Sequence, residues 1–374
     1  MTPRTAPTDA RAWVEVDLGA LVRNARALAA QAQKPLIPMI KADGYGVGAV
    51  SAARALEGIE PLAYGVSSID EAIELRQAGI ERPIILFTPS MLESPEPEWI
   101  PSDALLMTRH HVTPTLARRE HILAWGRSGL RPAWHLAIDT GMHRAGVDHQ
   151  ALASLHEALV EFPPLGAFTH FHSAELDDGS METQEKHFRN AVATLPRRPR
   201  LLHAENSAAI VRRPASEWDC VRPGVFLYGV GSGQKAALRP EPVVSLRARV
   251  VEVRTVVAGE SVSYDATWRA ERESEIATVC CGYADGLRRH LGGTHGCGLV
   301  RGQRVPIAGL ITMDMTMLDV TGIGCKVGDV VTFLGKDGAE SLTAEAVAGR
   351  GGLSPYELLV GLRLRLPRVY TGTW

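Results

Sequence analysis

Short apolar runs alternate with helical segments between residues 36 and 228, and this alternation constrains the fold more than any other feature of the sequence. Such alternation is typical of βαβ units, whose strands are parallel. The candidate strands are 36–40, 62–66, 83–87, 104–107, 133–138, 166–171, 201–204 and 221–228. Eight strands in about 200 residues favour a closed, TIM-like (β/α)8 barrel over an open doubly wound sheet.

The pattern changes after a stretch at 231–237 that we interpret as a boundary loop. From residue 242 onward the chain reads as alternating strands with Gly-rich connections. We therefore expect a disordered leader over 1–11, the barrel over 12–238, and a mainly β domain over 239–374. Residues 12–17 are expected to form a strand, and Asp17 to cap the helix that begins at Leu18.

Composition limits the possible partners. Forty Lys and Arg against 42 Asp and Glu leave a net charge of −2, which gives a nucleic-acid or acidic-membrane partner no electrostatic support. No apolar run approaches the length of a membrane span. The five cysteines are odd in number and show no C-x-x-C spacing, which indicates free thiols and a cytoplasmic location. A small-molecule substrate fits this composition best.

Lys41 ends the apolar run 36–40 and is followed by the glycines of KADGYGVG. Glycines at 44, 46 and 48 allow a close approach of the backbone to a ligand. If its ammonium is partly desolvated, Lys41 can form a Schiff base or abstract a proton. The alternative is a strand that ends in a solvated lysine.

A barrel carries its chemistry at the carboxyl ends of its strands, and polar residues gather there. They are Lys41 and Tyr45, then Asp139, His143 and Arg144, then His170 and His172, then Asn206 and Ser207, and finally Arg222, Gly224 and Tyr228. Several of them have simpler interpretations. Asp139 can cap a turn, Ser207 can cap a helix with nothing bound, and His170 can be a hydrogen-bonded core histidine.

The hydroxyl of Ser207 and the backbone at Gly224 are the kind of pair that holds a phosphate at a barrel end. A lysine facing a phosphate-anchored ligand indicates pyridoxal phosphate. A competing hypothesis is a metal-dependent barrel hydrolase, because His170 and His172 are two apart on one strand and could share a metal. The cluster HLGGTHGC at 290–297 is metal-like as well, but we interpret it as a Gly-rich loop.

Nine segments make the chain resemble the alanine racemases, pyridoxal-phosphate enzymes with an N-terminal barrel and a C-terminal β domain. The segments are IKADGYG, IDTGMHRAG, FTHFHSAE, NSAA, VRPGVFLYG, GESVSYDATW, GYADG, TMDMTMLDV and PYELLVGLRLRLPRVY. The resemblance covers nearly the whole chain. It implies an isomerase that makes D-alanine for peptidoglycan, with a small amino acid as substrate.

The resemblance also implies roles for individual residues. Lys41 and Tyr264 correspond to the two catalytic bases, with Tyr264 supplied by the partner subunit of a homodimer whose active sites are composite. His170 and Arg222 correspond to a chain that stabilises the tyrosine phenolate, and Arg222 also faces the pyridine nitrogen. An arginine there leaves that nitrogen unprotonated, which favours racemisation over transamination.

Further residues follow by the same resemblance. The expected phosphate ligands are Tyr45, Ser207, Gly224, Val225 and Tyr356, and Asn206 is expected to bind the cofactor as well. Arg144 would hold the ring hydroxyl and, with Met313, the substrate carboxylate. Tyr283 and Tyr356 would narrow the pocket toward a small side chain.

The sequence departs from the family pattern at four positions. Ala137 stands where many members carry a carbamylated lysine that steadies the arginine, so Arg144 must be steadied in another way, for example by a bound anion. Leu310 replaces an arginine, Thr312 a cysteine, and Asp265 a glycine. Racemisation of serine or other small amino acids is therefore an alternative. A non-catalytic pyridoxal-phosphate carrier is a remote one, because such carriers lack the domain that contains Tyr264.

Overall fold

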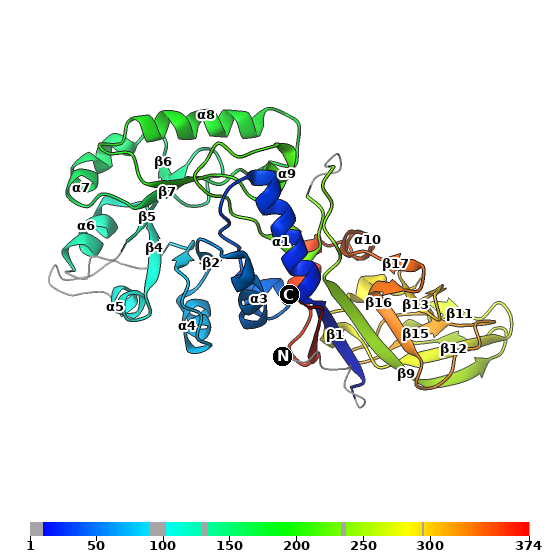
Figure 1. Ribbon diagram of the computed structural model, residues 1–374. Coiled ribbons are helices and arrows are strands. Elements are labelled where there is room, and N and C mark those ends of the chain that lie inside the picture. Colours follow the sequence, from blue (N-terminus) through cyan, green and yellow to red (C-terminus); the bar gives the residue numbers. More distant parts are fainter. Residues whose placement is uncertain (1–9, 90–101, 129–132, 233–236, 294, 374) are drawn as a thin grey trace.

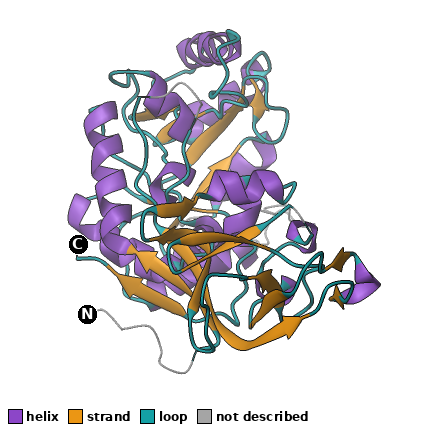
Figure 2. Ribbon diagram, turned by 90° about the vertical axis from the view of Figure 1, so that its right-hand side faces the viewer, coloured by secondary structure: helices purple, strands orange, loops and turns teal. Residues whose placement is uncertain are grey.

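The computed structural model describes residues 10–89, 102–128, 133–232, 237–293 and 295–373. It has two lobes that meet beside helix α1 (Leu18–Ala32) (Figure 1). Most helices belong to the first lobe, and strands make up most of the second (Figure 2). Residues 1–9 of the expected leader lie outside the described residues. Arg11, also expected in the leader, donates to the buried Asp285 carboxylate at 2.7 Å.

The first lobe is built around a ring of parallel strands in the order β2-β3-β4-β5-β7-β8. Their bounds are Tyr64–Val66, Ile84–Leu86, Val112–Leu116, His135–Asp139, Gly166–Phe168 and Leu201–His203, and β6 (Val147–Asp148) pairs with β5 outside the ring. Segment 36–40 closes the ring, since Leu36 bridges Val221 and Met39 bridges Gly65. Segment 219–223 lies beside β8, because Asp219 N donates to Leu202 O. Within the described residues these positions confirm the (β/α)8 class.

The strand expected at 104–107 is wrong, because these residues lie in helix α5 (Ser102–Arg109). Ala104 and Met107 are buried, whereas the two leucines between them are exposed. That spacing places one face of a helix against the core. The fourth barrel strand is β4, whose sequence VTPTL contains a proline that argues against a strand in sequence-based reasoning.

Helices α1 and α4 of the first lobe begin at side-chain caps. The Asp17 carboxylate accepts from Ala20 N at 2.8 Å and starts α1, as expected. Helix α4 (Ile69–Gln77) opens with a capping box between Ser68 and Glu71. The other helices are α2 (Lys41–Tyr45), α3 (Ala49–Leu56), α6 (Arg119–Arg127), α7 (His156–Glu161), α8 (Ser180–Ala193) and α9 (Ser207–Arg212), with short 3-10 helices η1 (Glu57–Ile59), η2 (Leu152–Leu155) and η3 (Val225–Tyr228).

The second lobe is organised around the long strand β9 (Val244–Val256), which pairs with β1, β12 and β16. The strand expected at 12–17 is β1 (Ala12–Asp17), and its partners are β9 and β18 rather than barrel strands. The remaining elements are β10 (Ser261–Val262), η4 (Tyr264–Ala266), β11 (Trp268–Arg269), β12 (Ser274–Val279), η5 (Tyr283–Asp285), η6 (Arg289–Leu291), β13 (Cys297–Val300), β14 (Gln303–Pro306), β15 (Thr316–Asp319), β16 (Val330–Asp337), β17 (Glu340–Leu342), α10 (Ala344–Arg350), α11 (Pro355–Val360) and β18 (Arg368–Thr371).

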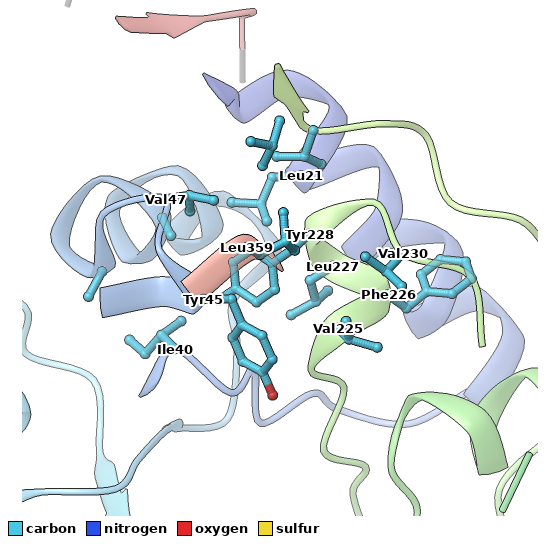
Figure 3. Close-up of a cluster of buried hydrophobic side chains, with 14 of the residues drawn as sticks. Leu21, Ile40, Tyr45, Val47, Val225, Phe226, Leu227, Tyr228, Val230 and Leu359 are labelled. Carbon is cyan, nitrogen blue, oxygen red and sulfur yellow. The ribbon is translucent and has the colours of Figure 1, made fainter. Parts of the chain in front are cut away.

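One hydrophobic core runs through both lobes. Figure 3 shows its part near the barrel mouth, where Tyr45 of α2 lies beside Tyr228 of η3 and Leu359 of α11 approaches from the second lobe. Because the lobes share buried apolar side chains, they are held together by the hydrophobic effect as well as by the chain. In the described part of the chain, no helix combines the length and the apolar character needed to cross a membrane.

Candidate active site

Lys41 lies at the carboxyl end of segment 36–40, as the sequence predicted. Its side chain is partly buried. Burial lowers the pKa of its ammonium below 10.5, the Arg144 guanidinium lowers it further, and the Glu71 carboxylate opposes both effects. The amine is therefore closer to its reactive, unprotonated form at neutral pH than an exposed lysine is.

The backbone after Lys41 forms a left-handed turn. Residues 42–46 have φ angles of 52°, 52°, 60°, 55° and 85°. For residues other than glycine, left-handed helical backbone costs roughly 1–2 kcal/mol each. Ala42, Asp43 and Tyr45 all adopt it, so neighbouring contacts must stabilise the conformation.

Arg222 lies in segment 219–223, which takes the last strand position of the barrel. Its side chain is buried, with 4% of its surface exposed. Its Nη1 donates to Nδ1 and O of His203 at 2.7 and 2.8 Å, and its Nη2 donates to Thr169 O at 2.6 Å and Ala204 O at 3.1 Å. Burial lowers the Arg222 pKa to about 10. The guanidinium remains charged at neutral pH.

Two buried histidines stand behind Arg222. His203 Nε2 lies 2.8 Å from His135 Nδ1. Since His203 Nδ1 accepts from Arg222, its Nε2 carries the proton and donates to His135. Burial, together with the Arg222 charge, lowers the pKa of His135 to about 4 and that of His203 well below 6.5. The histidines are neutral, and Arg222 is held without a carboxylate among these partners.

His170 follows strand β7 at the same end of the barrel. Burial and the cations Arg222, Arg144 and Lys41 lower its pKa to about 3. These four groups therefore lie within electrostatic range of one another, and the imidazole of His170 is neutral. The hydrogen bonds of Arg222 described above do not include His170.

The loop after β5 carries Arg144, whose side chain is exposed. Asp139 shapes this loop, since its Oδ1 accepts from Gly141 N at 2.9 Å and Met142 N at 3.0 Å. The interpretation of Asp139 as a turn cap is therefore confirmed. Ala137 is buried on β5 close in sequence to this loop.

The expected phosphate ligands converge where α9 meets η3. Ser207 Oγ accepts from Gly224 N at 2.9 Å and from Phe226 N at 3.4 Å. The helix cap is Asn206 rather than Ser207, since Asn206 Oδ1 accepts from Ala209 N. A Cβ at Gly224 would lie 2.6 Å from Tyr45 Oη, so a larger residue there would force this hydroxyl to move.

Tyrosine rings line the same region. Tyr45 stacks on Tyr228 with ring centroids 4.6 Å apart, and Tyr356 of α11 lies 6.4 Å from Tyr45 (Figure 3 shows the first pair). Burial raises the pKa values of Tyr45, Tyr356 and Tyr228. Val225 is buried next to them at the start of η3. The second lobe thus contributes Tyr356 to the barrel site of its own chain.

Tyr264, Tyr283 and Met313 form a second, separate group on the second lobe. Ser263 Oγ donates to Leu310 O at 2.7 Å, and Tyr283 N donates to Thr312 O at 3.0 Å, which brings their loops together. Tyr264, Tyr283 and Met313 are 66%, 40% and 54% exposed. In Figure 1, β11, which follows Tyr264, lies at the end of the second lobe remote from the barrel.

Comparison with known proteins identifies the family. A model of the alanine racemase N-terminal domain matches residues 16–232, and a model of the C-terminal domain matches 243–370. The chain belongs to the alanine racemase family. An alanine racemase of Sorangium cellulosum is 38% identical over 388 aligned positions, covering 95% of this chain and 98% of that protein. One of Nostoc is 35% identical over 96% of this chain and 95% of that protein.

Solved structures of alanine racemases agree with this assignment. The enzyme of E. faecalis superposes with a TM-score of 0.88 at 31% identity, covering 96% of this chain and 98% of that one. The enzyme of Bartonella henselae, solved with covalently bound pyridoxal phosphate, has a TM-score of 0.86 at 28% identity over 97% of this chain and 100% of that one.

Sequence reasoning missed four residues that contact the expected site of this family member. His135 and His203 hold Arg222, Glu71 accepts from Ala42 N, and Arg368 donates to Gly46 O. The sequence could have pointed to His135 and His203, because each lies on a predicted strand that leads to a predicted site residue. No feature of the sequence around Glu71 or Arg368 indicates a contact with the site.

The metal hypothesis finds no support in the described ranges, where no three His, Cys, Asp or Glu residues gather in a way that could hold a metal ion. His172 is exposed and contacts Ser173 Oγ, whereas His170 lies among cations. In the loop at 290–297, His290 and His295 stack on each other with centroids 5.2 Å apart. Thr294, between them, lies outside the described residues.

Proposed function

We propose that this chain interconverts L-alanine and D-alanine with pyridoxal phosphate as cofactor. One arrangement supports the proposal. Lys41, with its lowered pKa, shares a barrel end with the buried Arg222 and the Ser207–Gly224 pair. The full-length relatives that carry the name alanine racemase make this arrangement specific to that reaction.

The residues at this barrel end fit pyridoxal phosphate. Lys41 offers an amine to its aldehyde, and the closely packed Tyr45, Ser207 and Gly224 offer donors and clearance to its phosphate. Val225 and Tyr356 would complete the phosphate site, and Asn206 would also bind the cofactor. Arg222 would face the ring nitrogen, and Arg144 the ring hydroxyl. When bound, the cofactor withdraws electrons from the α-carbon of the substrate.

Racemisation requires that the α-proton leaves one face of the substrate and returns to the other. We assign one face to the Lys41 amine and the other to the Tyr264 phenol oxygen. A phenol has an ordinary pKa near 10, so its ionised form must be stabilised. The neutral His170 imidazole can donate one hydrogen bond to this oxygen, and the Arg222 charge stabilises the negative charge from behind.

Tyr264 must come from a second chain, which makes each active site composite and the enzyme a homodimer. The exposure of Tyr264, Tyr283 and Met313 supports this, since three large apolar side chains on adjacent loops are typical of a covered surface. Met313 and Arg144 would hold the substrate carboxylate. Tyr283 and Tyr356 would limit the side chain to a small size.

Asp265, next to the catalytic tyrosine, has φ of 60°. A glycine adopts that conformation without strain, and aspartate is among the residues that tolerate it. The Asp265 carboxylate lies 3.6 Å from Arg289. The departure from glycine therefore leaves the Tyr264 backbone in place. The roles of Ala137, Leu310 and Thr312 in specificity stay predictions, as does the cytoplasmic location of an enzyme that supplies D-alanine to peptidoglycan.

The proposal is tested by incubating the purified protein with a panel of L-amino acids, with and without added pyridoxal phosphate. We expect optical rotation to disappear fastest with alanine. Faster loss of optical rotation with serine would instead indicate a racemase of broader specificity. Binding of the cofactor with no loss of rotation for any amino acid would contradict the proposal and favour a carrier.

A further inference from the structure

The left-handed turn after Lys41 is held by side chains of the second lobe. Arg368, on β18, donates from Nη2 and Nε to Gly46 O at 3.0 and 3.3 Å. The same guanidinium donates to Leu362 O at 2.9 Å and Leu366 O at 2.8 Å. It therefore ties the loop after α11 to the turn that begins at Lys41.

Tyr370, two residues further along β18, adds a second contact. Its Oη donates to Val47 O at 3.0 Å. A Cβ at Gly48 would lie 2.1 Å from Tyr370 Oη, and one at Gly46 would lie 2.4 Å from Leu359 O. The second lobe packs so closely on this turn that only glycine fits at both positions.

The turn also has partners in the barrel. Glu71 Oε1 accepts from Ala42 N at 2.7 Å, and Asp43 Oδ1 accepts from Ala49 N at 2.8 Å. Glu71 fixes the end nearest Lys41, and the second lobe fixes the other end. A left-handed turn with three non-glycine residues persists only where surrounding contacts determine it, and here they come from both lobes.

We propose that Arg368 and Tyr370 are positioning residues for Lys41. By holding the carbonyls of Gly46 and Val47, they keep the turn left-handed and so fix the direction in which the lysine amine points. Their effect on turnover rests on the proposed function, in which Lys41 moves the α-proton. The second lobe then serves Lys41 of its own chain as well as the partner's active site.

The first measurement uses the holoenzyme and the variants Tyr370→Phe and Arg368→Met. Proton transfer depends on alignment, so kcat should fall about 10- to 100-fold while KM changes less than about threefold. The matched control is Arg304→Met. Arg304 is an exposed arginine of the second lobe that bonds to Glu340 and Ser341, and its variant should retain wild-type kcat.

The second measurement does not depend on turnover. Lys41 of the cofactor-free protein is acylated at a series of pH values, and its labelling is followed by mass spectrometry. In Tyr370→Phe and Arg368→Met the relaxed turn should expose the amine, and half-maximal labelling should move to higher pH. Guanidinium added to Arg368→Ala should move it back toward the wild-type value.

Folded Tyr370→Phe and Arg368→Met proteins with wild-type kcat and an unchanged labelling midpoint would overturn the proposal. If Arg368→Met does not fold, Tyr370→Phe decides, since it removes one hydroxyl only. If the wild-type protein does not racemise alanine, the proposed function is wrong. The labelling shift would still test the positioning of Lys41.

Discussion

Lowering the pH from 7 to 5 should destabilise the protein through two buried histidines. His135 and His203 are 1% and 0% exposed, and burial and the Arg222 charge lower the pKa of both, that of His135 to about 4. A histidine in the unfolded chain has a pKa of about 6.5. Below that pH the unfolded chain binds protons before the folded chain does, so stability is lost as the pH falls from about 6.5 toward 4.

The size of the effect follows from the two pKa values. One histidine that stays neutral in the folded protein contributes a loss of about 2 kcal/mol between pH 7 and pH 5, since the slope approaches about 1.4 kcal/mol per pH unit. The loss from His135 alone is a sizeable part of the roughly 5–15 kcal/mol by which proteins are stable, and His203, whose pKa is lowered well below 6.5 by burial and the Arg222 charge, adds to it. His170, with its pKa lowered to about 3, acts in the same direction.

The assay is equilibrium unfolding in urea at several pH values between 7 and 5. His135→Gln retains a hydrogen-bond acceptor for His203 but does not titrate, so its loss should be smaller by about 2 kcal/mol. His156→Gln, at an exposed position on α7, is the matched control and should behave like the wild type. An unfolding free energy that is constant from pH 7 to pH 5 would refute the reasoning. Equal losses in wild type and His135→Gln would refute it as well.

Three substitutions test the proposed roles of single residues. Lys41→Ala should abolish the absorbance band of cofactor joined to the lysine as a Schiff base, and persistence of that band would remove Lys41 from its role. Gly224→Ala should weaken cofactor affinity at least about tenfold, because its Cβ would lie 2.6 Å from Tyr45 Oη. An unchanged dissociation constant for the cofactor would argue against the phosphate site proposed at Gly224. Tyr264→Phe should spare the cofactor and slow α-proton removal from one enantiomer far more than from the other, whereas equal, mild losses in isotope exchange would contradict two bases.

The barrel was predictable because most of its strands are short apolar runs between helices, a local pattern. The run at 104–107 failed because two buried and two exposed apolar residues of one helical turn look like a buried strand in sequence. The strand that does form, β4, was missed because it contains Pro114, and a proline argues against a strand. The partners of β1 were not predictable, since pairing Val14 with Leu246 and Arg368 depends on segments more than 200 residues away.

The site was predictable where chemistry needs a particular residue type at a strand end, as with Lys41, Arg222 and Ser207. The glycines at 44, 46 and 48 indicated a backbone that approaches a ligand closely. The positive φ angles of Ala42, Asp43 and Tyr45 could not be predicted from the sequence. Tertiary contacts impose that conformation. The Arg222–His203–His135 chain was missed for a similar reason, because only the folded sheet brings β5, β8 and the segment that carries Arg222 together.

The central claim, a site shared between two chains, is tested most directly by mixing two inactive variants. Lys41→Ala and Tyr264→Phe are each expected to be nearly inactive. Random mixing makes half of the dimers hybrid, and each hybrid contains one site with both Lys41 and Tyr264 intact. The mixture should then recover about one quarter of wild-type racemase activity. No recovery in a mixture shown to contain hybrid dimers would contradict the composite site.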